Sequence, residues 1–215
     1  MTMNKILFLF FIAAFPFYAT AQVGQIKLPG DSASPSLSVS ATGYYYFFPE
    51  ADNNTYTVIG YLDYKSLHLE PRYNYEDRNT GSVFAGWKFK SEGKVNVAVT
   101  PMIGVIFGNI KGFAPALELE LSYKAFDFYT ENEYVVDQAG SNYNFYYAWT
   151  ELGYSPLENF RTGISIQRTR LYETGLDLQR GVFAEYSFWK LTVGIHYYNP
   201  FSTEYFFISS LNFEL

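Results

Sequence analysis

The chain has 215 residues, enough for one sizeable domain or barrel, and aromatic residues make up 21% of it. It carries 15 lysines and arginines against 21 acidic residues, a net charge of −6. This balance argues against a nucleic-acid partner, because phosphate binding needs clustered basic side chains. Cysteine is absent, which excludes both a disulfide framework and a thiolate metal site.

The N-terminus has the pattern of an export signal. Lys5 supplies a positive charge, residues 6–15 form a short apolar stretch, and residues 19–21 form a small-x-small cleavage motif. A membrane anchor is the competing interpretation, but the apolar stretch is shorter than the about 20 residues that a spanning helix needs. We predict a signal peptide at 1–21, a periplasmic lead-in, small plug or disordered terminus at 22–35, and the folded domain at 36–215.

Apolar or aromatic side chains alternate with polar ones along residues 67–76. Side chains in a strand point alternately to its two faces, so this segment has one apolar and one polar face, with Tyr73 and Tyr75 on the apolar side. The alternation recurs along most of the chain, between short turn-forming segments. We predict twelve strands, at residues 36–48, 56–64, 67–76, 82–90, 95–108, 115–124, 126–136, 143–154, 160–172, 176–188, 190–199 and 205–215.

Two further observations favour a membrane barrel over a soluble fold. Short connections alternate with longer ones, as in barrels with short periplasmic turns and longer outer loops. Aromatic residues on the apolar faces gather near the strand ends, where amphipathic rings favour the headgroup level, and aliphatic residues occupy the middle. The sequence predicts an all-β, transmembrane, antiparallel up-and-down β-barrel of about twelve strands in the outer membrane; a secreted β-sandwich is the alternative. The aromatic residues expected at the outer rim are Tyr45, Phe47, Tyr73, Tyr75, Phe107, Tyr134, Tyr172 and Tyr197.

Three arginines disturb the alternation: Arg168, Arg170 and Arg180. Strict alternation would point them at lipid, which costs about 2–4 kcal/mol each at mid-depth and less near the interface. A β-bulge that turns them inward is the cheaper arrangement, and we predict one here.

The chain resembles small porin-like outer-membrane β-barrel proteins of Gram-negative bacteria. The likeness rests on the export signal, the even number of hairpin-connected strands, the final segment 212–215, and the segments 72–77 and 167–170. It is architectural and covers essentially the whole mature chain, although Leu215 stands where such barrels often end on an aromatic residue. The resemblance implies contact with outer-membrane lipid and lipopolysaccharide, and insertion by the barrel-assembly machinery. It supplies no catalytic residues, ligands or cofactors.

The polar strand faces place many charged side chains inside the expected barrel. An acidic wall opposite basic walls is typical of a pore that orients polar or charged solutes. We predict a narrow passive channel for small polar or charged solutes. A plugged structural barrel is the alternative, since inward aromatic residues favour a crowded interior and twelve strands do not decide the lumen size. Those aromatic residues are Tyr44, Tyr46, Phe48, Phe84, Tyr129 and Phe206. The residues expected to line the lumen are Glu70, Arg72, Glu76, Lys88, Lys90, Glu118, Glu120, Glu131, Glu133, Arg168, Arg170, Arg180 and Glu185.

A lipid-modifying hydrolase is the less favoured alternative, because some outer-membrane barrels cleave lipids with a Ser-His-acid set. The chain has only His68 and His196, both expected on inward faces, and no serine in a G-x-S-x-G context. A base acting on bilayer lipid should face the lipid. We also expect no cofactor and no metal site, because two histidines on distant strands lack ligand spacing. The short outer loops leave little surface for an adhesion or receptor role.

Overall fold

The computed structural model describes residues 37–50, 53–171 and 177–215. The expected signal peptide at 1–21 and the segment 22–35 lie outside the described residues, as does Tyr172. No helix in the described ranges is long and apolar enough to cross a membrane.

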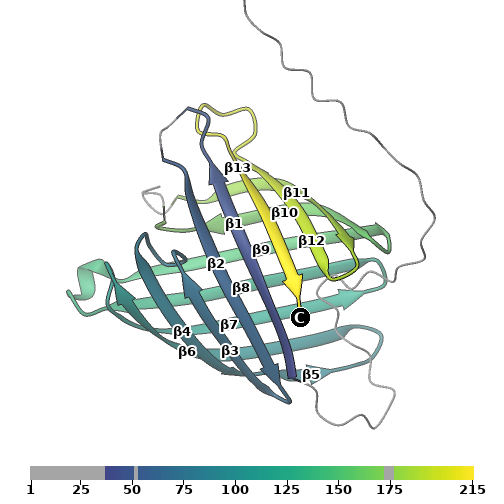
Figure 1. The fold of residues 1–215 in the computed structure, drawn as a ribbon, viewed down its shortest axis with the longest axis horizontal. Helices are drawn as coiled ribbons and strands as arrows, with labels where there is room; N and C mark the ends of the chain where they lie inside the picture. The colour runs from purple at the N-terminus through teal and green to yellow at the C-terminus, as the bar shows by residue number, and fades with distance from the viewer. Residues whose placement is uncertain (1–36, 51–52, 172–176) are drawn as a thin grey trace, which may run out of the picture.

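The described chain forms one closed antiparallel β-barrel (Figure 1), in which each strand pairs with its sequence neighbour. The barrel closes where β13 pairs with β1, so that the last strand lies beside the first. The β4 and β5 segments both pair with β6 and are two parts of one strand, which gives twelve strands around the barrel, as the sequence predicts. The elements are β1 (Leu37–Phe47), β2 (Thr55–Tyr64), β3 (Leu67–Tyr73), β4 (Thr80–Trp87), β5 (Phe89–Ser91), β6 (Asn96–Gly108), β7 (Gly112–Tyr123), β8 (Phe126–Asp137), η1 (Ser141–Tyr143), β9 (Phe145–Leu157), β10 (Phe160–Arg168), β11 (Gln179–Phe188), β12 (Leu191–Tyr198) and β13 (Phe206–Glu214).

The two ends of the barrel differ in their connections. At one end, which we call the short-turn end, four hairpins are joined by only two residues each. Three of these turns begin with a residue in the left-handed region, a conformation that suits tight hairpins between twisted strands: Lys65, Lys124 and Trp189. At the opposite, long-loop end, most connections are longer, including the segments after β1, β3, β8, β10 and β12. Short turns face the periplasm in outer-membrane barrels.

The outer wall of the barrel is apolar. Aliphatic side chains such as Ile103, Val105 and Val182 are about half exposed in the middle of their strands, where lipid would cover them. Exposed aromatic rings lie nearer the strand ends, among them Tyr45, Phe47, Trp87, Phe89, Phe107, Tyr123, Phe126, Tyr134, Tyr154, Tyr186 and Phe188. An aliphatic band between two aromatic girdles is the surface that a bilayer requires.

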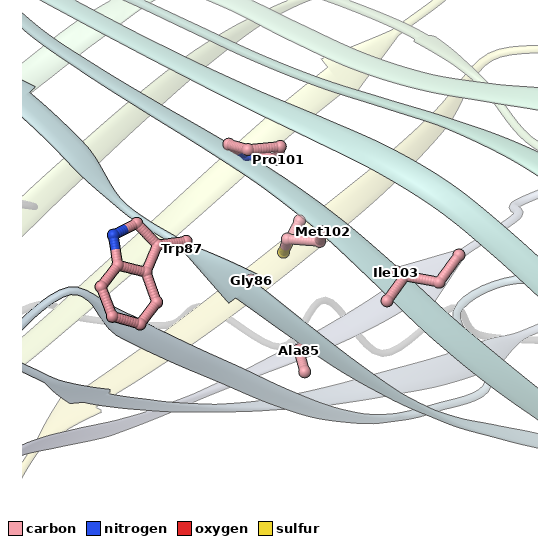
Figure 2. Close-up of a pocket in the computed structure, with 6 residues that line it drawn as sticks. All are labelled: Ala85, Gly86, Trp87, Pro101, Met102 and Ile103. Atoms are coloured by element: carbon pink, nitrogen blue, oxygen red, sulfur yellow. The ribbon is translucent and has the colours of Figure 1, made fainter.

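The break between β4 and β5 has a local cause on the neighbouring strand. β4 pairs with β6 as far as Met102, and β5 resumes the pairing at Val99, so the interruption lies opposite Pro101. Proline has no N–H to donate to a ladder, which explains why the partner strand is interrupted there. A shallow pocket of about 370 Å³ lies beside this break, between β4 and β6. Figure 2 shows two of the residues that line it, Met102 and Gly86, next to each other.

The predicted end of the third strand is wrong, with a consequence for the interior. β3 ends at Tyr73 rather than at residue 76, because Asn74 adopts a left-handed φ of 55° and turns the chain. The alternation therefore stops, and Tyr75 is buried inside the barrel, 6% exposed, instead of lying on the outer rim.

Candidate functional site

The first of two ion-pair networks inside the barrel has Arg72 at its centre, and we call it the Arg72 network. The side chain of Arg72 is fully buried, and its Nη2 lies 2.5 Å from Oε2 of Glu70 on the same strand. From β8, Glu131 lies 2.8 Å from Nη2 and Glu133 lies 3.0 Å from Nη1. Glu76, in the segment after β3, lies 3.9 Å from Nη1. One guanidinium thus faces four buried carboxylates.

Two aromatic rings fix the position of that guanidinium. The Arg72 guanidinium carbon lies 4.0 Å from the ring centroid of Phe84 and 4.5 Å from that of Tyr75. Phe84 can lie flat over the neighbouring strand because its partner in the register is Gly104, where an added Cβ would come within 2.5 Å of the ring. The Tyr75 hydroxyl donates a hydrogen bond of 2.5 Å to Glu131. Cation–π contacts and the carboxylates together hold the charge in place.

A histidine and two glutamates, which we call the His68 cluster (His68, Glu70 and Glu118), adjoin this network. His68 Nε2 lies 2.8 Å from Glu70 Oε1 and 3.9 Å from Glu118 Oε2. Its Nδ1 lies 2.6 Å from Asp63 on β2. The other oxygen of Glu118 accepts a hydrogen bond of 2.9 Å from the Tyr129 hydroxyl. Both ring nitrogens of His68 therefore face carboxylates.

Lys88 extends this group of charges towards the short-turn end. It lies in the break between β4 and β5, with Nζ 3.4 Å from Asp63 and 3.7 Å from Glu120. These contacts are partly exposed, unlike those of Arg72.

The second network, which we call the Arg161 network, occupies another sector of the barrel. Arg161 is the second residue of β10, beside the turn after β9, and its guanidinium pairs with Asp127 at 2.6 Å, Glu151 at 2.8 Å and Glu185 at 2.9 Å. His196 Nε2 lies 2.9 Å from the second oxygen of Glu151. Three carboxylates thus face one arginine and one histidine.

Glycines make room for this network as well. The guanidinium carbon of Arg161 lies 4.5 Å from the centroid of Phe183, whose ring lies over Gly163; an added Cβ there would come within 2.9 Å of it. At Gly153, an added Cβ would lie 2.4 Å from an Asp127 oxygen and 2.6 Å from Arg161 Nε. The ion pair of Arg161 with Asp127 therefore passes directly over a position that has no side chain.

Aromatic side chains from opposite walls meet across the lumen. Tyr44 on β1 lies with its ring centroid 5.8 Å from that of Trp149 on β9, although four strands separate them on the nearer side. At the long-loop end, Tyr75 lies 4.7 Å from Tyr147. The expected inward aromatic residues all lie on the inner face, buried or half-buried, and crowd the lumen: Tyr44, Tyr46, Phe48, Phe84, Tyr129 and Phe206.

The structure distributes the remaining expected lumen residues as follows. Members of the Arg72 network are Glu70, Arg72, Glu76, Glu131 and Glu133. Glu118 belongs to the His68 cluster, Lys88 and Glu120 pair near the short-turn end, and Glu185 belongs to the Arg161 network. Lys90 is exposed at the short-turn end, opposite the buried Ala98 in the register.

The bulge predicted to turn Arg168, Arg170 and Arg180 inward is absent from the described residues, so this prediction is wrong. The register runs on without a shift through Ile166, opposite Arg180, so Arg180 keeps its outward position and is exposed. Arg168 also stays outside, where its guanidinium bonds the backbone oxygen of Tyr146 and lies 6.0 Å from that ring. Arg170 follows the end of β10 at the long-loop mouth, 3.9 Å from Asp77. A position near the interface, within reach of backbone oxygens and water, makes a bulge unnecessary.

The centre of the second network was not among the residues expected from the sequence. Strand alternation could have found it, because Phe160 faces outward in the girdle and the next residue, Arg161, must then face inward. The same rule applies to Glu151 before the outward Leu152. What the alternation could not supply is that the acidic partners of Arg161 come from β8, β9 and β11.

No known family model matches the chain, and no curated protein matches it. Among solved structures, the KdgM porin superimposes on it with a TM-score of 0.61 at 12% identity, over 82% of this chain and 99% of the porin. The chain shares the fold of that porin. The values are the same for "KdgM porin in complex with disordered oligogalacturonate". The outer membrane protein Omp33 of Acinetobacter baumannii gives a TM-score of 0.49 at 14% identity, over 83% of this chain and 98% of the other.

The fold and the surface lead to the same conclusion. The barrel is closed, its outer wall carries an aliphatic band between aromatic girdles, and its polar groups lie inside. The protein is a porin-like β-barrel of the outer membrane. At 12% identity the likeness to the KdgM porin concerns the fold, so the function must be argued from the lumen of this chain.

Proposed function

We propose that the protein is a narrow passive channel of the outer membrane for small polar or charged solutes, with a preference for cations. The observation that carries the proposal is the charge of the lumen. Among the described residues, the permanently cationic partners in its ion pairs are Arg72, Lys88 and Arg161, with Arg170 at the long-loop mouth. Their carboxylates are far more numerous: Asp63, Glu70, Glu76, Glu118, Glu120, Asp127, Glu131, Glu133, Glu151 and Glu185.

Charged groups that line a channel set which solutes enter it, because field lines focus in a narrow low-dielectric passage. An acidic lumen attracts cations and repels anions. Oligogalacturonate, which is bound in one of the KdgM porin structures, is an acidic sugar oligomer. The carboxylate excess in this lumen is unsuited to such a ligand, and we therefore propose small cationic or neutral polar solutes instead.

A plugged barrel is the second candidate, and the aromatic contacts favour it. Rings from β1 and β9 meet at Tyr44 and Trp149, and the segment after β3 brings Tyr75 against Tyr147 and Glu131. A lumen that these side chains hold closed would give a structural barrel without conductance. A lipid hydrolase would need a catalytic base that faces the lipid. Both histidines are instead buried inside the barrel, His68 at 2% and His196 at 1% exposure.

Single-channel conductance of the refolded mature protein in a planar bilayer tests the proposal. We expect stable, salt-dependent steps, and a reversal potential in a KCl gradient that indicates preference for the cation. The double variant Glu118→Gln and Glu120→Gln, which removes two inward carboxylates of β7, should move the selectivity towards the anion. Arg168→Gln serves as the matched control, because this charge lies on the outer wall.

The possible results separate the candidates. A folded barrel, shown by its heat-dependent mobility on a gel, that never conducts would overturn the channel and support the plugged barrel. A conducting barrel with anion preference, or one whose selectivity does not change in the double variant, would overturn the proposed role of the acidic wall.

A further inference from the structure

The His68 cluster has the geometry of a metal site. Nε2 of His68, one oxygen of Glu70 and one oxygen of Glu118 lie within 4.8 Å of one another, and all three residues are buried. They come from two strands, since His68 and Glu70 alternate along β3 and Glu118 lies on β7. An imidazole nitrogen and two carboxylate oxygens form a donor set that suits borderline divalent metals such as Zn²⁺.

An unpartnered hydroxyl lies beside the same place. Thr100 on β6 is directly opposite Glu118 in the register, is 1% exposed, and has no hydrogen-bond partner for its Oγ1 among the described residues. Gly86, the partner of His68 on β4, has no side chain, and a Cβ built there would lie 3.1 Å from the Thr100 methyl group. Thr100 is thus next to Glu118 in the register and close to Gly86, where the Met102 side chain lies nearer still, 2.5 Å from the built Cβ. A buried hydroxyl without a partner is costly unless a ligand or water satisfies it.

The charge of the surroundings indicates a cation. In the part of the chain that the structure describes, Arg72 is the one arginine paired with Glu70, Glu76, Glu131 and Glu133. One oxygen of Glu76 and one of Glu133 have no hydrogen-bond partner among the residues described. Buried carboxylates in such excess need either protons or a further positive charge. A divalent ion between Glu70 and Glu118 would add two positive charges to this group of buried carboxylates, beside Glu70 of the Arg72 network.

We propose that His68, Glu70 and Glu118 bind one divalent transition-metal ion, of which Zn²⁺ is the best match. His68 binds it through Nε2 and releases the proton of that nitrogen to solvent. Asp63, 2.6 Å from Nδ1, accepts a hydrogen bond from the remaining ring N–H and so fixes the tautomer and orientation of the imidazole. Asp63 is thus a positioning residue, and Thr100 or water completes the coordination.

Isothermal titration calorimetry of the folded mature barrel in detergent, stripped of metal with EDTA, tests the site without any requirement for conductance. We expect about one Zn²⁺ per barrel, and no binding of Mg²⁺ at the same concentration. Glu118→Gln and His68→Gln should abolish the Zn²⁺ heat. Asp63→Asn should weaken the affinity about 10–100-fold, as the loss of a histidine's carboxylate partner does in other sites. X-ray absorption at the zinc edge should show nitrogen and oxygen ligands at about 2.0–2.2 Å.

His196→Gln is the matched control, because His196 is equally buried and also pairs with a glutamate, but in the Arg161 network. Its Zn²⁺ binding should equal that of the unchanged protein. Heat-dependent gel mobility establishes that each variant is folded; if His68→Gln does not fold, the comparison rests on Glu118→Gln and Asp63→Asn. The absence of Zn²⁺ binding to the unchanged barrel overturns the proposal, as does binding that persists in Glu118→Gln or that is lost in His196→Gln.

Discussion

The two arginine networks are built alike and differ in their charge balance. In each, a guanidinium lies on a phenylalanine ring, Phe84 or Phe183, and that ring covers a glycine. Arg72 is fully buried among four carboxylates, whereas Arg161 keeps 9% of its side chain exposed and faces three carboxylates. A histidine shares one carboxylate in each network, His68 at Glu70 and His196 at Glu151. Both networks therefore have more carboxylates than arginines, and the Arg72 network has the larger excess and the deeper burial.

This difference indicates separate roles. The Arg161 network ties neighbouring strands together, because its ion pairs join β8, β9, β10 and β11. The Arg72 network has more carboxylates than its arginine can neutralise, so its stability depends on that one residue. With the larger carboxylate excess and the deeper burial, the Arg72 network is the better candidate for attracting ions.

Replacement of Arg72 with alanine should have the largest effect. It leaves four buried carboxylates without their common partner, and loss of one partner of a buried ion pair costs about 3–5 kcal/mol. We expect a correspondingly lower free energy of unfolding, measured by tryptophan fluorescence during urea denaturation in detergent. Arg161→Ala should cost less, because two of its three carboxylates, Asp127 and Glu185, are partly exposed. An equal or smaller loss for Arg72→Ala would contradict the comparison.

The fold could be predicted almost completely from the sequence, for a physical reason. Alternation along a strand determines which side chains face lipid, so twelve strands, two girdles and an inward set of charges follow from the order of residues alone. The end of β3 could not be predicted this way, because the left-handed conformation of Asn74 changes the face on which Tyr75 lies. Alternation also gives no reason to expect that Arg168 would find a backbone oxygen at the interface.

Tyr75→Phe should have the next largest effect. It retains the ring contacts with Arg72 and Tyr147 and removes only the hydroxyl that donates to Glu131. A hydrogen bond to a charged group contributes about 1.5–3 kcal/mol, and we expect the unfolding free energy to fall by that amount. The same denaturation experiment on Tyr134→Phe is the control, because that ring lies exposed on the outer wall. A loss no larger than the control's would show that the Arg72 network does not depend on the inward turn after β3.

Partners across the lumen could not be predicted from the sequence at all. Glu70 meets Arg72 two residues away on its own strand, whereas Glu131 lies on β8, with three strands between it and β3. Which inward charges meet depends on register and on the positions of glycines, and neither is visible in the alternation of polar and apolar residues. The His68 cluster escaped prediction for this reason, since its glutamates come from β3 and β7.

Gly153→Ala tests whether the Arg161 network needs the space above Gly153. We expect a smaller loss of unfolding free energy than in Tyr75→Phe. The added Cβ would meet Asp127 and Arg161 at 2.4 and 2.6 Å, so the ion pair must shift. Overpacking of this kind typically costs about 1–3 kcal/mol. Gly43→Ala is the matched control, because nothing lies within 4 Å of its added Cβ. If both variants unfold at the same urea concentration, the space over Gly153 is not what positions Arg161.

Arg168→Gln should have the smallest effect and completes the comparison. This arginine lies outside the barrel against the backbone oxygen and ring of Tyr146, and substitutions at such surface positions usually change stability by less than about 0.5 kcal/mol. The variant removes a guanidinium, as Arg72→Ala does, but from a place where water and headgroups can replace its contacts. A large loss here would mean that arginines stabilise this barrel wherever they lie. A small one shows that the loss at Arg72 comes from the buried carboxylates around it.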